Sequence, residues 1–105
     1  MISQDRMEKA LKYLAETDAE VAQAEGDVLS AEYKVDLVKD RIFLTSEGTV
    51  AERQARAGVS NETLTAHTEY VSALVALKRL KAKRATEAMI LETWRTQEAS
   101  RRHGL

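Results

Sequence analysis

The sequence predicts an all-α protein, a long antiparallel helical hairpin of coiled-coil type, and three observations support this prediction. Apolar residues recur with heptad spacing through roughly the first 45 of the 105 residues. Proline is absent, and only four glycines interrupt the chain. Two of these, Gly48 and Gly58, lie close together near the middle, where a hairpin of two equal helices would turn.

The first helix is predicted over about residues 4–46. Ser3 is a candidate N-cap, Asp5 follows in the first turn, and Gly48 ends the pattern. A seam of alternating large and small residues, which is typical of a helix packed closely against another, runs along this segment. Its large members are Met7, Leu14, Val21, Val28, Val35 and Ile42, and its small members are Ala10, Thr17, Ala24, Ala31, Val38 and Thr45.

A connector is predicted over about 47–60 and a second long helix over about 61–102. Thr49 and Glu52 match a capping box, which indicates a short helix over about 50–57 that ends at Gly58. Ser60 and Asn61 are N-cap candidates for the second long helix. Residues 1–105 are therefore expected to form a single helical-hairpin domain.

Opposite charge in the two halves favours the antiparallel pairing. Residues 1–57 carry eight Lys/Arg against twelve Asp/Glu, and residues 58–105 carry eight against five. The halves therefore attract each other, and this asymmetry disfavours parallel pairing of two identical helices.

The second helix carries more apolar surface than one seam needs. We expect Val71, Leu74, Val75, Ala82, Ala85 and Met89 to occupy one sector and Leu77, Leu80, Leu91 and Trp94 another. The second set is the candidate partner-binding surface, most simply buried against another copy in a homodimeric four-helix bundle. Alternatively, the short segment over 50–57 folds back over it. Trp94 is either a plug at the end of the bundle or an anchor for a partner.

No catalytic, cofactor or metal site is predicted, and we expect no enzyme activity. Asp18, Glu25 and Glu32 recur every seven residues, as carboxylates of a di-metal bundle would, but the accompanying Glu-x-x-His motif is missing. His67 and His103 are the only histidines and are far apart. No Ser or Thr has a His and a carboxylate at a spacing that suits nucleophilic catalysis.

A basic run over residues 78–84 is the densest charge feature and the basis of an alternative function. It could contact phosphates weakly, in a salt-sensitive way, although no aromatic residues interleave with it. The plainer interpretation is a solvated face matched to the acidic first helix. The candidate nucleic-acid-binding residues are Arg79, Lys83, Arg84, Arg101 and Arg102.

Composition predicts a cytoplasmic protein. No apolar run approaches the roughly 20 residues of a membrane span. The N-terminal segment, with Asp5 and Glu8, does not read as a signal peptide. The absence of cysteine leans toward a reducing compartment.

Three segments resemble small uncharacterised helical proteins of tailed bacteriophages and prophages. They are residues 5–15 (DRMEKALKYLA), residues 46–53 (SEGTVAER) and residues 93–95 (TWR). Such proteins are often encoded near recombination and single-strand-binding genes. The resemblance implies an accessory role in the host cytoplasm and assigns no functional residue.

Two functions are consistent with these observations. The first is a non-enzymatic interaction protein, a phage accessory factor that docks on a recombination, replication or host-defence protein. The alternative is a helical protein that binds nucleic acid through the basic stretch. Salt dependence separates them, because counterion release weakens binding to nucleic acid far more than it weakens apolar docking.

Overall fold

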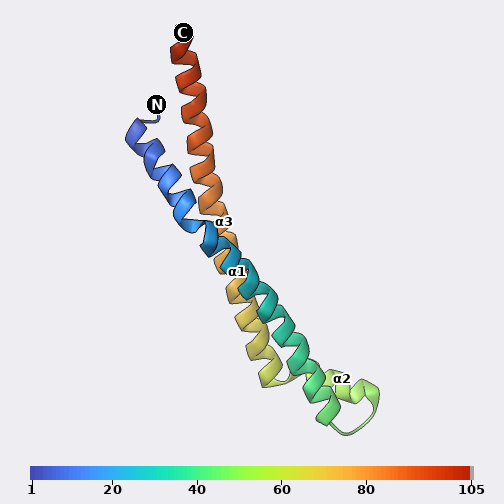
Figure 1. Cartoon of the computed structure of the whole chain (residues 1–105). Coiled ribbons are helices and arrows are strands. Elements are labelled where there is room, and N and C mark those ends of the chain that lie inside the picture. The colour runs from blue at the N-terminus through green and yellow to red at the C-terminus, as the bar shows by residue number, and fades with distance from the viewer. Residues whose placement is uncertain (105) are drawn as a thin grey trace. The chain divides into compact units, whose positions relative to one another are not determined.

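The computed structural model describes residues 1–104 and contains three helices (Figure 1). They are α1 (Gln4–Thr45), α2 (Val50–Val59) and α3 (Asn61–Arg102). No strand occurs among the described residues, so the predicted all-α hairpin of two long helices is confirmed. Every helix begins and ends within about two residues of its predicted bound. No helix in this part of the chain is long and apolar enough to cross a membrane.

The chain divides into two compact units, each containing a stretch of α1 beside a stretch of α3. The terminal unit comprises residues 1–22 and, as far as the chain is described, 78–104. The connector unit comprises Gln23–Leu77 and includes α2. In each unit the two helices run antiparallel. The Ile2 amide donates to Gln97 Oε1 at 2.9 Å in the terminal unit, and Lys34 pairs with Glu69 at 2.9 Å in the connector unit.

Burial along α1 follows the predicted heptad seam. Its most buried side chains, Met7, Ala10, Thr17 and Val28, all lie at seam positions. Val28 is 9% exposed, whereas the next residue, Leu29, is 66% exposed. The other seam residues from Leu14 to Ile42 are half-buried, so the assignment of the inner face of α1 is confirmed.

The inner face of α3 differs from the predicted one. Leu77 and Leu91 are buried on the side of α3 that packs against α1, whereas Val71, Val75 and Met89 are exposed. The prediction that the intramolecular seam cannot cover Leu77, Leu80 and Leu91 is therefore wrong. The observed inner positions follow alternating spacings of three and four residues: Thr63, Ala66, Tyr70, Ala73, Leu77, Leu80, Arg84, Glu87, Leu91 and Trp94.

Polar residues in this seam account for the error. Arg84 of α3 is half-buried, and its Nη1 donates to the Leu14 carbonyl at 2.9 Å and to the Thr17 hydroxyl. Its Nη2 donates to Asp18 at 2.7 Å. The guanidinium thus reaches across to α1 while its stem occupies a seam position. An interpretation that follows only apolar residues skips such a position and loses the register of the seam.

Glu87 is the second charged seam residue, and Arg6 of α1 neutralises it. Arg6 Nη2 lies 2.8 Å from both carboxylate oxygens and donates a well-directed hydrogen bond to Oε1. Within residues 1–104, Oε2 has no hydrogen-bond donor of good geometry. The Arg6 hydrogen bond lowers the pKa of Glu87, partial burial opposes this effect, and the charges of Arg6 and Lys83 add to it.

The lowered pKa of Glu87 predicts a pH-dependent contribution to stability. The folded chain protonates Glu87 at lower pH than the unfolded chain, so this contribution is present above the ordinary carboxyl pKa of 4.5 and is lost as pH falls below it. We expect Glu87→Gln to melt at a lower temperature than the native chain at pH 7. This difference in melting temperature should disappear as the pH is lowered. Thermal melts across pH test this, with the exposed Glu92→Gln as control. A deficit that persists in acid would contradict the assignment.

The connector is fixed by caps and by two arginines of α2. The Thr49 hydroxyl accepts a hydrogen bond from the Glu52 amide at 3.2 Å, as the capping motif predicts. The Arg53 guanidinium lies 4.2 Å from the centre of the Phe43 ring and donates to the Phe43 carbonyl at 2.9 Å. Arg56 donates to the Glu47 carbonyl at 2.7 Å. Gly48 has a φ of +114°, a conformation that favours glycine and allows the chain to turn out of α1.

Candidate interaction surface

Each long helix has an outer face, which consists of the heptad positions that point away from the partner helix. On α1 this face carries four exposed large side chains, Leu29, Tyr33, Leu37 and Leu44, which we call the α1 outer stripe. Their spacings of four, four and seven residues keep them on one side of the helix. Tyr33, at the centre of this side, is 65% exposed. Single exposed apolar residues are ordinary, but here four large side chains share one side of the helix, which makes this side the candidate interaction surface.

The outer face of α3 carries a corresponding row. Leu64, Val71 and Val75 form the α3 outer stripe, and all three are exposed. Threonine and serine occupy the other outer positions between them, at residues 65, 68 and 72. The outer face of α3 therefore has no charged residue until Lys78 and Arg79, one turn beyond Val75.

Charges on the two outer faces have opposite signs. Between residues 23 and 45, the outer face of α1 has only two charged residues, Asp36 and Asp40. Between residues 61 and 82, the outer face of α3 has only Lys78 and Arg79. Within the described chain none of these four side chains makes an ion pair or a hydrogen bond. They are therefore available to a partner.

The predicted partner-binding residues do not form an exposed surface. Leu77 and Leu91 are buried and Leu80 is half-buried, all on the inner face of α3. Trp94 packs against the cluster formed by Met7, Ala10 and Leu91. Of the two roles considered for Trp94, this position fits the plug at the end of the terminal unit.

The candidate nucleic-acid-binding residues are divided among different contacts. Arg84 is held in the inner seam, Lys83 lies 4.7 Å from the centre of the Tyr13 ring, and Arg101 pairs with Glu98. Within residues 1–104, Arg79 and Arg102 make no ion pair. The basic run thus includes residues with intramolecular roles and does not present five equivalent free cations.

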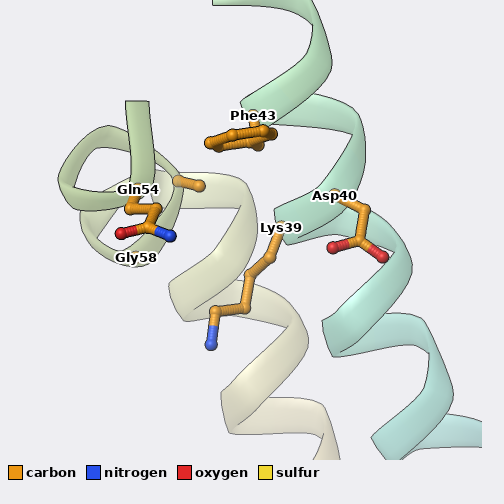
Figure 2. Close-up of a pocket in the computed structure, with 6 residues that line it drawn as sticks. Lys39, Asp40, Phe43, Gln54 and Gly58 are labelled. Atoms are coloured by element: carbon orange, nitrogen blue, oxygen red, sulfur yellow. The ribbon is translucent and has the colours of Figure 1, made fainter. Parts of the chain in front are cut away.

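A groove lies between α1 and α2 in the connector unit (Figure 2). Lys39, Asp40 and Phe43 of α1 line it together with Gln54, Ala57 and Gly58 of α2. Among residues 1–104, no group of three or more His, Cys, Asp or Glu side chains is placed to hold a metal ion.

No family model, curated protein or solved structure matches this chain.

The sequence contains a signal that identifies the α3 outer stripe. If polar residues are allowed as members of the seam, alternating steps of three and four residues from Thr63 pass through Leu77 and Leu91. Val71 and Val75 then lie outside the seam. On α1 the position of Leu29, Tyr33 and Leu37 off the seam was visible in the sequence. Phe43, which the same pattern places off the seam, is half-buried beneath Arg53.

Proposed function

We propose that this protein is a non-enzymatic interaction protein that binds helical surfaces of other proteins through its outer stripes. The observation that carries the proposal is the exposed row of Leu29, Tyr33, Leu37 and Leu44. An amphipathic helix laid along this row would cover side chains spaced four and seven residues apart, which is the spacing that a helix presents to another helix. The inner seam holds the fold, and the outer stripes remain for binding.

The resemblance of residues 5–15, 46–53 and 93–95 to phage and prophage proteins supports a role for the chain as an accessory factor in the host cytoplasm. Its partner would then be a recombination, replication or host-defence protein. The burial of Leu77 and Leu91 moves the proposed docking surface from these residues to the outer stripes. The chemistry required of the partner is an apolar helix face with few charges.

Binding to nucleic acid is the second candidate, supported by the unpaired Arg79 and by the basic run around it. It is less favoured because Arg84 is held by Leu14, Thr17 and Asp18. A protein that binds phosphates needs several cations directed toward one backbone. Here Arg84, the last cation of the run, is directed toward α1 instead.

A paired experiment separates the two functions. The native chain, Tyr33→Lys and the double variant Arg79→Glu/Lys83→Glu are used to capture proteins from host and infected cells, with nuclease present, and are titrated with DNA at two salt concentrations. If the protein docks on other proteins, the amount of protein that Tyr33→Lys captures should fall at least about tenfold, while the double variant should capture as much as the native chain. Tight, salt-sensitive binding of DNA that the double variant abolishes and Tyr33→Lys retains would contradict the proposal.

A further inference from the structure

We infer that the α1 outer stripe of one copy of this protein docks on the α3 outer stripe of a second copy. The inference rests on the proposed docking role of the stripes and names their partner. It is carried by two observations, namely that both stripes are apolar and exposed, and that the charges beside them have opposite signs.

The two stripes match as surfaces of a helix pair. On α1, the outer face between residues 23 and 45 combines Leu29, Tyr33, Leu37 and Leu44 with the small residues Gly26 and Ser30. Nothing lies within 4 Å of a Cβ built on Gly26, so this position is open to an approaching helix. On α3, Val71 and Val75 stand beside short threonine and serine side chains. Large residues on one helix and small ones on the other allow close packing.

Charge decides which helix faces which. The acidic pair Asp36 and Asp40 lies within the α1 stripe, and the basic pair Lys78 and Arg79 follows the α3 stripe. Packing α1 on α1, or α3 on α3, of a second copy would therefore bring like charges together, whereas packing α1 on α3 pairs opposite charges.

The contact has a consequence for assembly. Within each unit, the outer face of α1 and the outer face of α3 point in opposite directions, because each points away from the other helix. A copy bound through its α1 stripe therefore keeps its own α3 stripe free. Such a heterologous contact can repeat until it closes or continues as an open array. The average mass should accordingly rise beyond that of a dimer as the concentration increases.

Sedimentation velocity of the full chain and of two single variants tests this inference. Tyr33→Lys places a cation in the α1 stripe, opposite Lys78 and Arg79 of the next copy, and Val75→Asp places an anion in the α3 stripe, opposite Asp36 and Asp40. Each variant alone is expected to associate at least about tenfold more weakly than the native chain, because a charge is desolvated in the contact. Ala55→Lys, on the exposed side of α2, is the control and should associate as the native chain does.

Mixing the variants gives the decisive result. The Tyr33→Lys copy retains an intact α3 stripe and the Val75→Asp copy an intact α1 stripe, so an equimolar mixture should form a 1:1 complex that grows no further. If Val75→Asp lowers helicity, Arg79→Glu replaces it, because Arg79 makes no contact that the fold needs. A chain that stays monomeric at submillimolar concentration, or a mixture that fails to pair, would overturn the inference.

The outcome is separable from that of the proposed function. A monomeric chain whose capture of a host protein depends on Tyr33 would overturn self-docking and keep the proposed function. A chain that assembles as described, but whose capture of other proteins does not respond to Tyr33→Lys, would keep self-docking and overturn docking on other proteins.

Discussion

Val28→Asp is expected to lower the free energy of unfolding by roughly 2–4 kcal/mol, which is a large fraction of the stability of a chain of this size. Val28 is 9% exposed at the inner seam of the connector unit. A carboxylate at this position would lose most of its hydration, and within the described chain no basic side chain pairs at this seam position. Chemical denaturation followed by circular dichroism measures the change.

Two controls show whether the effect belongs to the seam. Leu29→Asp adds the same charge at the next position, which is 66% exposed, and Lys12→Asp changes an exposed residue whose pairing with Glu16 at 3.8 Å is weak. Both should change stability by less than about 1 kcal/mol. Equal losses in all three variants would show that the inner face of α1 has been assigned incorrectly.

Leu91→Ala is expected to cost about 2–3 kcal/mol, because it leaves a cavity beside Met7 and Ala10 in the terminal unit. Ala10 is fully buried, and its single methyl group is too short to fill the space. The same truncation at Met89, two residues away and 70% exposed, should cost less than about 0.5 kcal/mol. Thermal melts of both variants provide the comparison.

The dependence on concentration adds a separate test of the Leu91 assignment. Because Leu91 packs within one chain, the stability lost in Leu91→Ala should be the same in dilute and concentrated protein. If Leu91 were instead buried between two copies, Leu91→Ala would lower the melting temperature more in concentrated than in dilute protein. A loss confined to concentrated protein would contradict the assignment.

The first helix could be predicted from the sequence almost residue by residue, and the second only in its extent. The α1 seam alternates large and small apolar residues, so its period is visible without knowledge of the partner. The α3 seam contains the polar residues Thr63, Arg84 and Glu87. Thr63 donates to the Ala57 carbonyl, Arg84 donates to Leu14 and Asp18, and Glu87 accepts a hydrogen bond from Arg6. The partner of Thr63 lies in α2 and those of Arg84 and Glu87 lie in α1, so the periodicity of α3 alone could not reveal why polar residues stand inside.

The candidate site was predictable in kind and not in position. An excess of apolar surface over what one seam needs was evident in the sequence, and the structure contains such an excess. Its location changed because the face of α3 that packs on α1 is chosen by ion pairs as well as by apolar area. Once Arg84 and Glu87 are placed inside, Val71 and Val75 lie outside, and the docking surface moves with them.

The most direct test of this assignment is the rate at which a thiol reacts at two neighbouring positions of α3. The chain has no cysteine, so Met89→Cys and Leu91→Cys each introduce a single reactive group. In dilute native protein we expect the thiol at position 89 to react nearly as fast as in the unfolded chain, and the thiol at position 91 to react at least about tenfold more slowly, because Leu91 is buried against α1. Equal rates, or faster reaction at position 91, would contradict the assignment of the inner and outer faces on which the proposed docking surfaces depend.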